Sequence, residues 1–135
     1  MKSVITAMLL WIGANTSYNV DLPHPEIVIL SQSQLERQYD DSKVYGELHG
    51  FYSAENHTIY LPDTFNIHDA WQKGVLLHEL IHYVQDKNNL KVQCYKEYER
   101  EAYPLQKQYL LEMHGLNWKY DEMWYKLIST CNPPY

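Results

Sequence analysis

Residues 74–84, with the sequence GVLLHELIHYV, are the stretch that most constrains the fold of this chain. A helix through them is apolar on nearly every face except the one that carries His78, Glu79 and His82. Residues four apart lie on the same side of an α-helix, so both imidazoles can reach one cation, while Glu79 is turned about 100° away. The pattern predicts a buried helix with two histidines and a carboxylate side by side.

Two histidines four residues apart also occur by chance on many helices, in structural roles. Here the surroundings favour a metal site, because a buried carboxylate between two imidazoles is costly unless it has a charged or hydrogen-bonding partner. We therefore expect Zn²⁺ at His78 and His82, with Glu79 placed to contact a zinc-bound water. Gly74 lies over the same face as His78, where it leaves room for a substrate or a neighbouring chain segment.

A catalytic zinc takes three protein ligands, so a further ligand is expected downstream. The acidic run at residues 97–103, EYEREAY, begins fifteen residues after His82, which suits a helix end at residues 88–89 and an antiparallel returning helix. One stripe of that second helix would carry Glu99, Ala102, Gln106, Tyr109 or Leu110, and Met113. We expect Glu99 to be the third ligand, with Glu101 in reserve. The alternative is a solvated, charged helix face.

These two elements resemble the gluzincin metallopeptidases, in which an H-E-x-x-H helix is followed by a second helix whose glutamate completes the zinc site. Residues 99–103, EREAY, resemble that second element, and the resemblance covers roughly residues 58–115. The pattern also resembles small bacterial domains called minigluzincins. Where many gluzincins carry an acidic residue that orients a ligating histidine, this chain has Tyr103. The resemblance implies a zinc-dependent peptidase with a minimal zincin-like core.

In such a peptidase His78, His82 and Glu99 hold zinc, and Glu79 removes a proton as water attacks the peptide carbonyl. The donor that stabilises the oxyanion is left open among three side chains: Tyr103, Tyr109 and His114. Two other functions are weighed against this one. The first is a non-catalytic zinc-binding or protein-interaction domain that retains the ligands, and the second is an amidase for non-peptide substrates.

The length and charge of the chain limit its class and its partners. At 135 residues it is expected to form a single domain, with a heavy aromatic load of 13 Tyr and 4 Trp for its core and a groove. The net charge of −6 and the lack of a basic run argue against a nucleic-acid partner. A peptide or protein substrate is the expected partner, and the charge weakly favours a basic one.

The N-terminal segment resembles a signal peptide, because Lys2 precedes an apolar stretch. Val4, Met8, Trp11 and Ile12 nevertheless fall at helical spacing. We expect residues 3–16 to form an amphipathic helix docked on the core, and the alternative is a retained signal or membrane anchor. The stretch is too short to span a bilayer, so no integral membrane segment is expected.

The segment between this helix and the metal-binding helix predicts strands at residues 26–30, 45–52 and 58–61, with a short helix within 31–39 and a turn at 54–57. Together they suggest a small antiparallel sheet ahead of the metal-binding helix, hence a mainly helical α+β fold. Asp69, followed three residues later by Gln72, resembles a capping box and predicts a helix start near Ala70.

The strand at residues 58–61 ends at Pro62, which cannot donate to a sheet ladder. We therefore expect an exposed edge strand that pairs with an extended peptide beside the zinc, as gluzincins pair with theirs. The residues assigned to this substrate site are Thr58, Ile59, Tyr60 and Leu61. The alternative is an interior strand with both edges paired.

The C-terminal part contains a proline within the second helix, Pro104, which predicts a kink, and Gly115, which predicts the helix end. Residues 116–130 are expected to form a last helix. Cys94 and Cys131 either form a disulfide, which indicates an oxidising compartment, or are two reduced thiols of a cytosolic protein. We slightly favour a secreted or periplasmic location.

Overall fold

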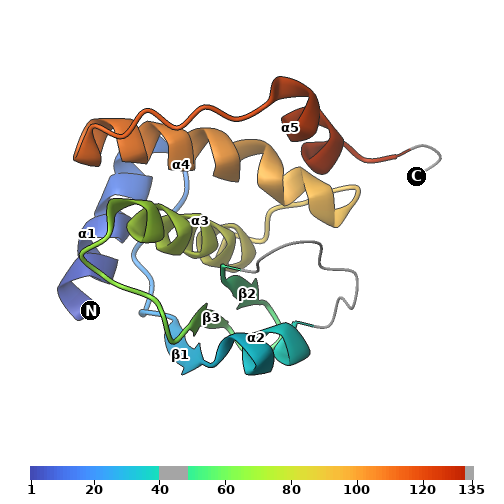
Figure 1. The fold of residues 1–135 in the computed structure, drawn as a ribbon. Helices are drawn as coiled ribbons and strands as arrows, with labels where there is room; N and C mark the ends of the chain where they lie inside the picture. The colour runs from blue at the N-terminus through green and yellow to red at the C-terminus, as the bar shows by residue number, and fades with distance from the viewer. Residues whose placement is uncertain (40–48, 133–135) are drawn as a thin grey trace.

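A computed structural model of the chain describes residues 1–39 and 49–132. Its central element is α3 (Ala70–Lys87), which lies between a small three-stranded sheet on one side and α4 (Glu99–His114) on the other (Figure 1). The N-terminal helix α1 (Lys2–Asn15) packs against the same core. The fold is mainly helical α+β, as the sequence predicts.

The sheet contains β1 (Glu26–Leu30), β2 (Phe51–Ser53) and β3 (Thr58–Pro62), in the order β1-β3-β2. β2 and β3 are antiparallel and joined by the turn at residues 54–57, whereas β1 is parallel to β3. The prediction of a purely antiparallel sheet is therefore wrong. Parallel pairing needs a crossover connection, and residues 31–57, which include α2 (Gln32–Gln38), provide it.

β3 is the central strand, and the prediction that it forms an exposed, substrate-binding edge is wrong. Both of its edges are paired, and all of its residues are buried. The residues of the predicted substrate site are thus core residues: Thr58, Ile59, Tyr60 and Leu61. Pro62 occupies the last position of the strand, where a missing N–H is tolerated, so it marks the end of the strand and not the edge of the sheet.

The short helix predicted within residues 31–39 is confirmed as α2. Ser31 Oγ accepts from the Gln34 backbone N–H at 3.2 Å, and Gln34 Oε1 accepts from the Ser31 N–H at 3.1 Å, which completes a capping box. The last two residues of the strand predicted at 45–52 belong to β2. Residues 45–48, with Gly46, lie outside the described part of the chain.

Helix α3 begins at Ala70 as predicted, because Asp69 Oδ2 accepts from the Gln72 N–H at 2.9 Å. The Gln72 side chain accepts from the Asn66 N–H at 2.5 Å. In a capping box it would accept from the Asp69 N–H. The helix ends at Lys87, and Asn89 follows in the left-handed region with φ 56°. The predicted boundaries of this helix are confirmed at both ends.

Helix α1 confirms the predicted docked N-terminal helix. Its buried stripe is Ile5, Met8, Leu9 and Ile12, and Val4 and Trp11 pack at the border of the core. Trp11 meets the ring of Tyr109 on α4 edge-on at 5.3 Å. Among the described residues, no helix is both long enough and apolar enough to cross a membrane.

Helices α3 and α4 approach closely at Gly74. A Cβ built at Gly74 would lie 2.8 Å from Leu110 Cδ2 of α4. The room predicted at this glycine is thus filled by a neighbouring segment of the same chain. Ala102, which lies on the predicted stripe of α4, is fully buried. The stripe is otherwise confirmed except at its end, where Met113 is exposed.

Pro104 lies inside α4, as predicted, and has no N–H for the carbonyl of Arg100 four residues earlier. That carbonyl accepts a hydrogen bond from the Tyr125 hydroxyl at 2.5 Å instead. Gly115 ends the helix in the left-handed conformation with φ 63°, as predicted.

The chain after Gly115 runs back over α4 in an extended course before α5 (Glu122–Ser129), as Figure 1 shows. The prediction of one helix over residues 116–130 is therefore wrong for residues 116–121. Asp121 starts α5, because its Oδ1 accepts from the Met123 N–H at 2.8 Å. A disulfide between Cys94 and Cys131, with Cα atoms 5.9 Å apart, fixes the segment after α5 beside the start of the 3₁₀ helix η1 (Tyr95–Tyr98).

Candidate metal centre

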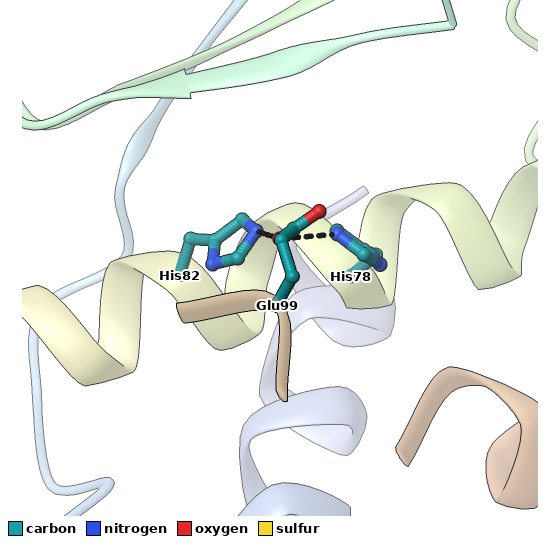
Figure 2. Close-up of side chains that lie close together, drawn as sticks. All are labelled: His78, His82 and Glu99. Atoms are coloured by element: carbon teal, nitrogen blue, oxygen red, sulfur yellow. Dashed lines mark hydrogen bonds and ion pairs between the residues drawn. The ribbon is translucent and has the colours of Figure 1, made fainter. Parts of the chain in front are cut away.

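His78 and His82 lie one turn apart on α3 and converge on one oxygen of Glu99. The Nε2 atom of His78 is 3.1 Å from Glu99 Oε1, and the Nε2 atom of His82 is 2.5 Å from the same oxygen. Figure 2 shows Glu99 reaching from the start of α4 to a point between the two imidazoles. Each residue offers one ligand atom, and the three atoms lie within 4.8 Å of one another.

The backbone around η1 decides which glutamate reaches the histidines. Glu99 is the first residue of α4, directly after η1. Glu101 is two residues on, about 200° around the helix, and it accepts a hydrogen bond from Gln85 Nε2 at 2.8 Å and another from the Tyr18 hydroxyl. The structure therefore brings the first choice, Glu99, to the histidine pair and places the reserve, Glu101, outside it.

Two buried glutamines hold the imidazoles from behind. Gln106 Oε1 lies 2.8 Å from His78 Nδ1, and Gln85 Oε1 lies 2.8 Å from His82 Nδ1. An acceptor at Nδ1 favours the tautomer that carries its proton there, which leaves Nε2 free to bind a metal. The acceptors behind both imidazoles are therefore amide oxygens.

The pKa values of His82 and Glu99 depend on each other's charge. Burial lowers the pKa of His82, but the charge and hydrogen bond of Glu99, the charge of Glu79 and the hydrogen bond of Gln85 together outweigh burial and raise this pKa to about 9. Burial raises the pKa of Glu99, but the charges of His82 and His78 and their hydrogen bonds hold it well below its ordinary value. The two shifts have opposite directions, so the cluster favours positive charge on His82 beside a negative Glu99.

Glu79 interacts electrostatically with His78, His82 and Glu99 but is not one of the three potential ligands. Its side chain is buried, and the Tyr52 backbone N–H donates a hydrogen bond to it. Burial raises the pKa of Glu79, although the charges of His78 and His82 oppose this shift. A carboxylate whose pKa moves toward neutrality is better suited to accept and return a proton near pH 7.

A cavity of about 530 Å³ opens over the cluster. Its floor is formed by α3 and the start of α4, with His78, Glu79, His82, Asp86, Glu99 and Tyr103. One wall comes from the β2 region, with Gly50, Phe51, Tyr52 and Ala54. The other comes from η1 and α5, with Tyr95, Lys96, Tyr98, Leu127 and Ile128. The histidine pair and its glutamates are therefore open to a ligand of peptide size.

Of the three oxyanion donors expected from the sequence, only Tyr103 lines this cavity. Its hydroxyl is hydrogen-bonded to Glu99, and its ring packs edge-on against His78 at 4.5 Å. Burial, followed by the charges of Glu99 and Glu79, raises the pKa of Tyr103, which keeps its hydroxyl protonated and able to donate. Tyr109 instead packs against Trp11 of α1.

His114 lies eleven residues beyond Tyr103, roughly 16 Å along the helix. It packs against Tyr109 at 5.4 Å, and its Nε2 is the one buried side-chain N or O in the described residues that has no hydrogen-bond partner. Burial and the charge of nearby Lys73 lower its pKa. It lies too far from the histidine pair to act on a substrate there.

Sequence reasoning missed the residues that support the cluster. Gln106 lies on the predicted stripe of α4, and Gln85 directly follows the largely apolar stretch at residues 74–84 of α3. A buried amide must be hydrogen-bonded, and this was the available signal for both. Tyr52 and Asp86 carry no such signal, because their roles depend on how the sheet meets α3.

Comparison with known proteins identifies the family. The chain belongs to the family described as Domain of unknown function (DUF6647), whose model matches residues 1–134. No curated protein and no solved structure matches the chain. The match includes both helices of the metal centre and the cysteine pair.

Proposed function

We propose that this protein is a zinc-dependent peptidase of gluzincin type. The observation that carries the proposal is the convergence of His78, His82 and Glu99 at the floor of a cavity that Glu79 also lines. Two imidazoles and one carboxylate are the ligand set of several catalytic zinc sites, which keep one coordination position open.

The residues present fit a zinc ion on chemical grounds. Both histidines have an acceptor at Nδ1, which directs Nε2 toward Glu99. His82 Nε2 and Glu99 Oε1 lie 2.5 Å apart, and the charge of Glu99 raises the pKa of His82, so these atoms favour positive charge between them, which a divalent cation would supply. His78, His82 and Glu99 would hold the ion, which would lower the pKa of bound water to about 7 and polarise a carbonyl.

The remaining steps belong to the side chains of the cavity. Glu79, held by the Tyr52 N–H, accepts the proton of the attacking water and returns it to the leaving amine. The protonated Tyr103 hydroxyl, which bonds Glu99 in this structure, would turn to donate its single proton to the oxyanion. Gln85 and Gln106 keep both imidazoles in a fixed orientation during the reaction.

The substrate side of the proposal is a peptide or an unfolded protein segment. The cavity suits an extended chain, because it lies between two walls, and β2 is the strand of the sheet that borders it. The disulfide between Cys94 and Cys131 supports a secreted or periplasmic location, since such bonds persist in oxidising compartments.

Zinc content and peptide hydrolysis test the proposal together. Wild-type protein purified without added metal should contain about one zinc per chain, while His78→Ala and His82→Ala should contain much less. Glu79→Gln should keep the zinc but lose hydrolysis of a broad peptide library. Equal zinc in wild type and both histidine variants would overturn the metal site. Bound zinc with no hydrolysis by wild type would favour a non-catalytic binding domain.

A further inference from the structure

The cavity contains one carboxylate that the proposed hydrolysis does not use. Asp86 lies on α3 four residues after His82, about 6 Å further along the same face of the helix. It lines the same cavity as the histidine pair. A third of its side-chain surface, 33%, remains exposed. Asp86 is therefore accessible to the part of a bound substrate that extends from the histidine pair along α3.

Asp86 is held in place through one of its two oxygens. Tyr52 donates its hydroxyl to Asp86 Oδ2 at 2.6 Å, and His57 Nε2 lies 3.7 Å from the same oxygen. Within the described part of the chain, no hydrogen bond or ion pair is made by Oδ1. A carboxylate can accept hydrogen bonds at both oxygens, so among the described residues Asp86 has one oxygen held by Tyr52 and one still available as an acceptor.

Tyr52 also sets the spacing between Asp86 and the reacting groups. Its backbone N–H bonds Glu79, and its hydroxyl bonds Asp86. Its ring packs against Tyr83 at 5.9 Å, which adds a further contact to α3. A single residue of β2 thus connects the proposed general base to the second carboxylate.

Among the residues that the structure describes, His57 at 3.7 Å is the ion-pair partner of Asp86, and no lysine or arginine pairs with it. Glu79 and Glu99 are balanced by the histidine pair and, in the proposed function, by zinc. Lys96 belongs to the opposite wall, where its Nζ donates to the Leu127 carbonyl at 3.3 Å. Apolar side chains of the walls, Phe51, Leu127 and Ile128, can pack against the aliphatic part of a long basic side chain.

We propose that Asp86 determines substrate specificity by binding a cationic group of the peptide within about two residues of the scissile bond. That group is the side chain of lysine or arginine, or a free N-terminal amine. The inference rests on the proposed peptidase function. Because Asp86 is partly exposed, the preference for a cation over a neutral group of the same shape should be about tenfold in kcat/KM.

Matched peptides test this inference. One series is blocked at both ends and carries lysine, norleucine or glutamate at each of the two positions on either side of the cleaved bond. A further peptide has norleucine and a free N-terminus. The ratio of kcat/KM for each charged peptide to its norleucine analogue is measured for wild type, Asp86→Asn and Asp21→Asn. Asp21 is an exposed residue outside the cavity, so its variant removes the same charge elsewhere.

In wild type and Asp21→Asn, we expect lysine to be preferred over norleucine about tenfold in kcat/KM at one position, and glutamate to be disfavoured there. In Asp86→Asn, the ratio of kcat/KM for lysine to norleucine should be near one. Asparagine keeps an oxygen for the Tyr52 hydroxyl, and thermal unfolding checks that the variant is folded. A preference for the free N-terminus that Asp86→Asn removes would identify the α-amine as the bound cation. The lysine preference of wild type should also fall with added salt. This test needs no variant.

Equal rates for lysine and norleucine peptides in wild type, or an unchanged ratio in folded Asp86→Asn, would overturn the role of Asp86 and leave the peptidase intact. No hydrolysis of any peptide by zinc-loaded wild type would contradict the proposed function itself, and the role of Asp86 with it.

Discussion

Replacing Gly74 with alanine tests whether the close approach of α3 and α4 is built into the sequence. The new Cβ would lie 2.8 Å from Leu110 Cδ2, 3.0 Å from Cγ and 3.2 Å from Cδ1, and Leu110 is fully buried. Overpacking a filled core costs typically about 1–3 kcal/mol. Alanine gains about 1 kcal/mol over glycine inside a helix. We expect the clash to exceed the gain, because Leu110 is fully buried and three of its side-chain atoms lie within 3.2 Å of the new Cβ.

The expected net loss is about 1 kcal/mol in the free energy of unfolding, or a decrease of about 3–5 °C in Tm. Urea and thermal unfolding of Gly74→Ala measure it. The matched control is Leu110→Ala, which removes all three contacting atoms, so Gly74→Ala should be stabilising by about 1 kcal/mol in that background. A stabilised single variant, or the same effect in both backgrounds, would refute the packing argument.

Three further predictions concern the support of the site and the fold. Gln106→Leu should weaken zinc binding by about 10–100-fold, measured by competition with a chelator, while Gln108→Leu on the outer side of the same helix should change it little. Replacing both Cys94 and Cys131 with serine should lower the free energy of unfolding by about 3–4 kcal/mol, because the bond closes a loop of 37 residues; an unchanged urea midpoint would contradict this. The lowered pKa of His114 means that the unfolded chain binds its proton more readily. Stability is therefore full above the ordinary value of 6.5 and falls as the pH drops below it. His114→Gln should flatten this fall between pH 7 and 5, as urea unfolding at several pH values can check.

Local signals in the sequence were sufficient for the helices around the metal centre. Asp69 predicts the start of α3, and the apolar pattern predicts its burial. The register of α4 predicts that Glu99 and not Glu101 faces α3, since Ala102 and Gln106 share its stripe. These features depend on helical geometry alone, which is the same wherever the helix lies.

The sheet could not be predicted in the same way. The pattern of residues 58–61 predicts a strand but not its partners, and a proline at a strand end occurs in interior strands as well as in edge strands. The direction of β1 depends on the crossover through residues 31–57, which no local pattern reveals. The position of Tyr52 between Glu79 and Asp86 follows from this topology, and so it was missed as well.

The end of the chain shows how tertiary contacts override an apparent helical pattern. The segment from Leu116 to Tyr120 is rich in aromatic residues, but it is extended and packs its rings against neighbours. Trp118 meets both Tyr103 and Trp71. Packing against α3 and α4 therefore decides its conformation, and helix propensity does not.

Anomalous diffraction at the zinc edge, from crystals of protein purified without added metal, tests the central claim most directly. The account predicts one strong peak per chain, within about 2.0–2.2 Å of Nε2 of His78, Nε2 of His82 and a carboxylate oxygen of Glu99. The peak should border the cavity that Glu79 lines. The absence of a peak at the histidine pair after incubation with zinc, or a peak coordinated by Glu101 in place of Glu99, would contradict it.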